Sequence, residues 1–130
     1  MGFYISGRLR EKISEIKMIN ERIAVAKIEM GESIKISVIQ VYAPTMEANA
    51  EVTSEFYSML QNTLEAEKEY YSIIMGDWNA KVGKNKVKDG CMGEYGLGKI
   101  NKNGELLVDF AYSNNMKISG TFFKKKNERK

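Results

Sequence analysis

Two features of the sequence pattern predict an α/β domain. Apolar runs at residues 21–30 and 33–42 are separated by a Gly-Glu turn, as in a β-hairpin. An amphipathic stretch at 49–68 is followed by another apolar run at 70–75. Two strands joined through a helix require a crossover connection, which is typical of an α/β arrangement.

The first residues predict two more elements. Residues 2–6 are short and apolar and indicate a strand. Residues 8–17 carry Leu9, Ile13 and Ile16 at helical spacing, so we expect a short helix or turn there.

The second strand of the hairpin changes character along its length. Ile36 and Val38 alternate with polar residues, but residues 38–41 are apolar on both faces, which favours a strand in the middle of a sandwich. Tyr42 ends the strand on the face of Ile36 and Val38, and Pro44 breaks the run.

The helix expected at 49–68 has Asn49 as its N-cap. Its apolar residues form one stripe, which we expect to pack on the sheet without a chemical role: Val52, Phe56, Met59, Leu60 and Leu64.

The C-terminal part begins with a long glycine-rich loop at 77–102, a length typical of functional or disordered segments. Asn103 can cap a second helix that ends at Asn114, and residues 116–123 indicate a further strand. The basic tail at 124–130 has the composition of a frayed terminus.

The composition of the chain bears on its partners, its location and its disulfides. The 130 residues have a net charge of +3, which permits an anionic partner without demanding one. No apolar run approaches the ~20 residues of a membrane span, and no secretory leader is recognisable, so we expect an intracellular protein of nucleus or cytoplasm. Cys91 is the one cysteine, which excludes an internal disulfide.

Histidine is absent from the chain. Its absence excludes Ser-His-Asp and Cys-His mechanisms within these residues, together with the usual zinc sites. Any metal would need oxygen ligands, which points to magnesium or manganese.

Asp77 and Asn79 are the leading candidate site residues. They follow an apolar strand and Gly76, and two residues apart on an extended backbone they would point the same way. The carboxylate can orient or deprotonate a water, and the amide can donate to a phosphate oxygen without adding negative charge. The alternative is that both simply stabilise a turn. A glycosidase would use two carboxylates, so the pair suits phosphodiester hydrolysis better.

Tyr42 is the third candidate. Its phenol could donate to a phosphate, although a tyrosine at the rim of a sheet can also be a packing residue with a hydrated hydroxyl.

Several separated motifs resemble the endonuclease/exonuclease/phosphatase superfamily, specifically the endonuclease domain of RTE-type non-LTR retrotransposons and the related craniofacial development protein 2-like proteins. They are Val-Ile-Gln-Val-Tyr-Ala-Pro-Thr at 38–45, Ile-Met-Gly-Asp-Trp-Asn-Ala-Lys-Val-Gly at 74–83, residues 96–107 with Phe110, and Thr-Phe-Phe at 121–123. The likeness covers nearly the whole chain in order. Trp78 stands where the family usually has Phe.

The resemblance implies a partial four-layer αββα sandwich over residues 1–123 and Mg²⁺-dependent cleavage of a DNA backbone. It also implies roles: the residue at Asp77 activates water, the one at Asn79 contacts the scissile phosphate, and the one at Tyr42 holds the phosphate. The family's metal-binding Glu lies before the part that matches, and its Asp-His pair lies after it. We therefore expect a central fragment that is inactive alone and holds Mg²⁺ weakly.

Two other functions stay open. The chain could be a non-catalytic nucleic-acid-binding or interaction protein that uses the loop lysines Lys81, Lys84, Lys86 and Lys88. It could also be a fragment without a stable function, because missing outer strands expose sheet edges.

Overall fold

The structure is a computed structural model that describes residues 2–84 and 90–124. The chain divides into two compact units, Met1–Asp77 and Trp78–Lys130, and each is considered by itself. Lys86, Lys88 and residues 125–130 of the tail lie outside the described residues.

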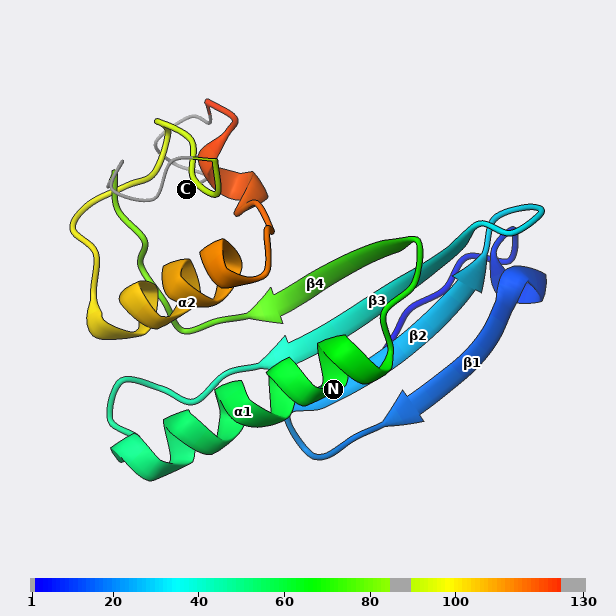
Figure 1. Cartoon of the computed structure of the whole chain (residues 1–130), viewed down its shortest axis with the longest axis horizontal. Coiled ribbons are helices and arrows are strands. Elements are labelled where there is room, and N and C mark those ends of the chain that lie inside the picture. The colour runs from blue at the N-terminus through cyan, green and yellow to red at the C-terminus, as the bar shows by residue number, and fades with distance from the viewer. Residues whose placement is uncertain (1, 85–89, 125–130) are drawn as a thin grey trace. The chain divides into compact units, whose positions relative to one another are not determined.

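The first unit is a four-stranded sheet with one long helix (Figure 1). The strands are β1 (Ile13–Met18), β2 (Ile23–Glu29), β3 (Lys35–Tyr42) and β4 (Tyr71–Asp77), and they lie in the order β1-β2-β3-β4. The first three strands pair antiparallel, whereas β4 is parallel to β3. The hairpin and the crossover through α1 (Ala50–Ala66) are therefore confirmed.

Helix α1 covers one face of this sheet (Figure 1). The buried core there contains strand residues and one stripe of the helix: Ile23, Val25, Ile39, Val41, Phe56, Leu60 and Leu64. Two members of the predicted stripe, Val52 and Met59, are exposed instead. The helix begins at the expected cap, because the Asn49 side chain accepts a hydrogen bond from the Val52 amide at 2.9 Å.

The other face of the sheet, called the open face below, is apolar. The registers place on it alternate residues of all four strands, with one charged residue at its edge: Ile16, Met18, Ala24, Ala26, Ile28, Ile36, Val38, Gln40, Tyr42, Tyr71, Ile73, Met75 and Asp77. Several of its large side chains are exposed, whereas Ser37, which belongs to the opposite face of β3, is fully buried. The polar face of β3 is thus buried at Ser37, although it is exposed at Lys35.

Of the two expectations for the first residues, the strand was wrong, and the short helix or turn is confirmed only as far as residue 12. Residues 2–6 form no strand, and only Arg10–Lys12 of the expected helix or turn is helical, as a single 3₁₀ turn called η1. The isoleucines at 13 and 16 belong to β1, which pairs with β2 from Ile13 to Met18. Backbone pairing with β2 therefore outweighs the helical spacing of these residues. Isoleucine itself also favours a strand.

The second unit contains α2 (Lys102–Ser113) and the 3₁₀ turn η2 (Ser119–Thr121). Its core is formed by Cys91, Met92, Val108 and Ala111, with partly buried neighbours packed around them. Asn101, rather than Asn103, caps α2: its side chain accepts from the Gly104 amide at 2.8 Å. The predicted end of this helix at Asn114 is confirmed.

The strand predicted at 116–123 does not form. Its backbone groups bond to loops and to α2 instead of to a sheet: the Met116 amide donates to Ala111 O at 2.8 Å, and the Ile118 amide to Cys91 O at 2.8 Å. A strand needs a neighbour to bond, and nothing in the described part of this unit supplies one.

Within the residues that the structure describes, no helix has the length and apolar character required to cross a bilayer.

Candidate functional site

Tyr42 and Asp77 end neighbouring parallel strands at the same edge of the sheet. They are register partners in β3 and β4, and the Ala43 amide donates to the Asp77 carbonyl at 2.8 Å, which ties the two strand ends together. Both residues are exposed. A phenol and a carboxylate therefore stand side by side at the carboxyl edge of a parallel strand pair, where α/β sheets bind ligands.

Arg22 belongs to this edge, although sequence reasoning missed it. Its guanidinium lies 5.8 Å from the Tyr42 ring centroid and its Nη1 donates to the Tyr42 carbonyl at 3.1 Å. The Tyr42 amide in turn donates to the Arg22 carbonyl at 2.9 Å. The signal that could have found it is the hairpin register: Ile23 faces Val41, so the preceding residue reaches Tyr42.

Asn79 belongs to the second unit, and its backbone departs from the sequence expectation. It has φ 46°, the left-handed region, so the extended backbone on which the expectation rested ends with β4 at Asp77. The Asn103 side-chain amide donates to the Asn79 carbonyl at 2.9 Å, and Asn103 is buried. Asn103, which was expected only to cap a helix, therefore stabilises the backbone of Asn79.

The residues that follow Asn79 are held by the start of α2. The Asn101 side chain accepts from the Lys81 amide at 3.1 Å, and the Asn101 amide donates to the Lys81 carbonyl at 3.0 Å. Trp78 stacks at a tilt on Phe110 of α2, with ring centroids 6.5 Å apart. A bulky aromatic residue at 78 thus packs within this unit.

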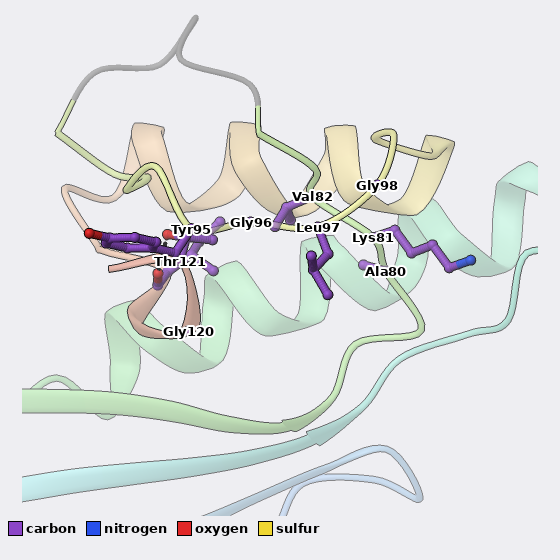
Figure 2. A pocket seen from close by; sticks show the side chains of 10 residues that line it. Ala80, Lys81, Val82, Tyr95, Gly96, Leu97, Gly98, Gly120 and Thr121 are labelled. Carbon is purple, nitrogen blue, oxygen red and sulfur yellow. Dashed lines mark hydrogen bonds between the residues drawn. The ribbon is translucent and has the colours of Figure 1, made fainter. Parts of the chain in front are cut away.

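A cavity of about 490 Å³ lies in the second unit. Figure 2 shows Tyr95 and Thr121 at one end and Lys81 at the other. Its lining is mostly backbone and aliphatic: Ala80, Lys81, Val82, Tyr95, Gly96, Leu97, Gly98, Ile118, Gly120 and Thr121. A hydrogen bond with the Glu94 carboxylate raises the pKa of the Tyr95 phenol, so this hydroxyl stays protonated at neutral pH.

No three Asp, Glu, Cys or His side chains within 2–84 and 90–124 come close enough to hold a metal ion. Asp77 is the one carboxylate among the three candidate residues, whereas Mg²⁺ in proteins is usually held by one or two carboxylates together with waters and substrate phosphates.

Of the four loop lysines, Lys81 and Lys84 lie in the described part and are exposed. Both follow Asn79 in the sequence, within the second unit.

Sequence comparison identifies two homologues with the same name. Craniofacial development protein 2 of Bos taurus is 36% identical over 126 residues, which cover 96% of this chain and 21% of that protein. Craniofacial development protein 2 of Tragulus javanicus is 35% identical over 126 residues, 96% of this chain and 22% of that protein. The chain therefore spans about a fifth of the length of the curated relatives it matches.

Comparison with models of known protein families found no match. Comparison with solved structures found none either.

Proposed function

We propose that the chain is part of a divalent-metal-dependent phosphodiesterase domain of the endonuclease/exonuclease/phosphatase superfamily, of the type found in RTE retrotransposons, acting on DNA. The observation that carries the proposal is the pairing of Tyr42 with Asp77 at the end of β3 and β4. These are two of the three residues that the motif resemblance marks as catalytic, and they come from segments 35 positions apart in the sequence.

The chemistry of the pair suits a phosphodiester. Exposed at one strand edge, the Asp77 carboxylate can accept a proton from a water and the Tyr42 phenol can donate to a phosphate oxygen. Arg22 adds a fixed positive charge beside Tyr42. A guanidinium has five N–H donors, so after its bond to the Tyr42 carbonyl it retains donors for a phosphate.

Asn79, in the second unit, is the third residue that the motif resemblance marks, as the one that contacts the scissile phosphate. Its left-handed backbone and the bond from Asn103 give its main chain a defined conformation.

The open face supports the sandwich architecture in the proposal. One face of the sheet is covered by a helix and the other is apolar and partly exposed, as each half of a two-sheet sandwich requires. Sheet-on-sheet packing buries such a face against a second sheet about 10 Å away.

We infer that the 130 residues alone do not cleave DNA. The candidate residues include one carboxylate, the sequence contains no histidine, and the described residues hold no metal-binding cluster. Loss of single groups that stabilise transition-state charge costs on the order of 10²–10³ in rate, so the loss of several removes measurable catalysis.

A plasmid-nicking assay of the purified chain with magnesium tests this inference. We expect no nicking above the buffer background. Nicking that disappears in both Asp77→Ala and Asn79→Ala would show that these residues act without the missing groups and would contradict the inference. Glu55→Ala, at an exposed position of α1, is the matched control.

DNA binding is measured separately by a gel shift of a short duplex over a range of salt concentrations. Binding that weakens in Lys81→Gln and Lys84→Gln, with a shallower salt dependence, would favour the non-catalytic nucleic-acid-binding alternative. Binding that depends on Arg22 and Tyr42 instead would support the phosphodiesterase site.

A further inference from the structure

We propose that Asn103 is a positioning residue for Asn79: it fixes the main chain from which the Asn79 side chain reaches a phosphate. The inference rests on the proposed function, because it concerns the part that Asn79 takes in phosphodiester cleavage. It gives a role to residues 96–107, a motif that carries the resemblance but includes none of the three candidate catalytic residues. All the contacts that support it lie within the second unit.

Asn103 is buried, with 5% of its surface exposed, in the first turn of α2. Burying a side-chain amide is unfavourable unless its polar atoms are hydrogen-bonded, and asparagine forms helices less readily than alanine. The Asn103 Nδ2 donates to the Asn79 carbonyl oxygen at 2.9 Å, a partner 24 positions away and outside the helix. This bond gives a reason for an amide at position 103 that helix formation alone does not supply.

Two further features hold the start of α2 against the same segment. The Asn101 side chain accepts from the Lys81 amide at 3.1 Å, and the Asn101 amide donates to the Lys81 carbonyl at 3.0 Å. A Cβ on Gly104 would overlap that carbonyl oxygen and lie 2.7 Å from its carbon, so the close approach requires glycine. The peptide groups before and after Ala80 are therefore both hydrogen-bonded to the start of α2.

The bond at the Asn79 carbonyl selects one conformation of that residue. Asn79 has φ 46°, and asparagine visits this left-handed region more often than most residues but also adopts extended and right-handed backbone. The rotamers that its side chain can adopt depend on the backbone conformation. Since a misplacement of about 1 Å can cost on the order of 100-fold in rate, a donor that fixes the Asn79 main chain contributes to the contact with the phosphate.

NMR of the isotope-labelled 130-residue chain tests whether Asn103 fixes this conformation. In the wild type we expect a strong nuclear Overhauser effect between the amide and α protons of Asn79, because a positive φ brings these protons close together. Asn103→Ala removes the donor and should weaken this signal. Asn103→Asp keeps the side-chain size, adds a charge that is favourable in a first helical turn, and should weaken it as well.

Val108→Ala is the matched control, because it removes packing from the core of the second unit and leaves the Asn103 bond in place. It should leave the Asn79 signal unchanged. Circular dichroism shows whether each variant is folded.

A gel shift of a short DNA duplex by the same chain measures the phosphate contact. Asn79→Ala and Asn103→Ala, neither of which changes the net charge, should each weaken binding about tenfold, as expected for a hydrogen bond to a charged group. The double variant should bind no more weakly than Asn79→Ala alone, because both substitutions remove the same contact. A purely structural role for Asn103 would give losses that add. Val108→Ala should leave binding unchanged.

The results distinguish this inference from the proposed function. If Asn79→Ala weakens binding but Asn103→Ala does not, or if their losses add, the positioning role is wrong and the proposed function stands. The positioning role is also wrong if Asn79 keeps its signal in folded Asn103→Ala and Asn103→Asp. If the wild type does not bind the duplex, or Asn79→Ala leaves binding unchanged, Asn79 makes no phosphate contact. That result overturns the role of Asn79 in the proposed function together with the positioning role.

Discussion

Gly76 of β4 lies against the backbone of Val41 in β3 so closely that no side chain fits. A Cβ on Gly76 would overlap the Val41 carbonyl oxygen and lie 2.9 Å from the carbonyl carbon. Gly76 also has φ 139°, a conformation that residues with a side chain rarely adopt. The position immediately before Asp77 therefore requires glycine, because the β3 backbone lies against it.

Gly76→Ala should destabilise the first unit by about 3 kcal/mol or more, because it adds both backbone strain and a steric clash. Gly31→Ala is the matched control, since Gly31 has a similar φ of 145° but nothing within 4 Å of its Cβ position. Strain alone should cost about 1–2 kcal/mol there. Urea denaturation measures both, and equal losses would contradict the proposed clash.

Ser37→Ala should leave the stability unchanged or raise it by up to about 1 kcal/mol. The Ser37 side chain is fully buried, and its hydroxyl has no hydrogen-bond partner within the described part of the chain. Removing a buried polar group without a partner removes a desolvation cost. Ser14→Ala, at an exposed strand position, controls for strand propensity. If Ser37→Ala instead lowered the free energy of unfolding by more than about 1 kcal/mol, the hydroxyl would have a stabilising contact.

Glu67 should make the stability of the first unit depend on pH. Hydrogen bonds from Lys17 and then Lys27 lower the pKa of Glu67 below its ordinary value of 4.5, with burial acting in the opposite direction. A carboxyl whose pKa is lowered by folding stabilises the fold above its unfolded pKa, and this contribution disappears as the pH falls below 4.5 through the folded value.

Glu67→Gln should therefore lower the melting temperature at pH 7, and the difference from wild type should shrink as the solution is acidified below pH 4.5. The pKa values of Lys17 and Lys27 are raised above 10.5, chiefly by their bonds to Glu67. The difference in melting temperature between wild type and variant should therefore also shrink as the pH rises above 10.5. Glu55→Gln, at an exposed position of the same helix, should show no such profile. A constant difference across pH would exclude this linkage.

Asn101→Ala should destabilise the second unit by about 1–2 kcal/mol, because one side-chain oxygen accepts from both the Gly104 and the Lys81 amides. Asn101→Asp retains an acceptor at a helix N-terminus and should preserve most of the stability. Near-ultraviolet circular dichroism of Trp78 during thermal unfolding follows this unit. Equal effects of the two substitutions would show that the acceptor is not the stabilising feature.

The elements predicted correctly from sequence are those with a strong local signal. The hairpin, the Asn49 cap and the strand that ends at Asp77 each depend on residues close together in the chain. The sequence pattern also located Tyr42 and Asp77, and their pairing follows from a crossover that makes β3 and β4 parallel.

The errors come from partners that a local pattern does not contain. Residues 13–18 become a strand because β2 offers an edge to pair with, and residues 116–123 fail to become one because no strand lies beside them in the described unit. Ser37 is buried because α1 covers its face, which alternation alone cannot indicate. Arg22 and Asn103 act through backbone contacts to Tyr42 and Asn79, and only tertiary structure shows these.

The central claim is that this chain carries part of a phosphodiesterase site, and a chimera tests it most directly. The 126 matched residues of Bos taurus craniofacial development protein 2 would be replaced by this chain's, and magnesium-dependent plasmid nicking measured beside the unmodified protein. We predict nicking by both proteins, reduced on the order of 100-fold or more by Asp77→Ala or Asn79→Ala in the chimera and unchanged by Glu55→Ala. No nicking by either protein, or nicking by the chimera that both substitutions leave intact, would contradict the claim.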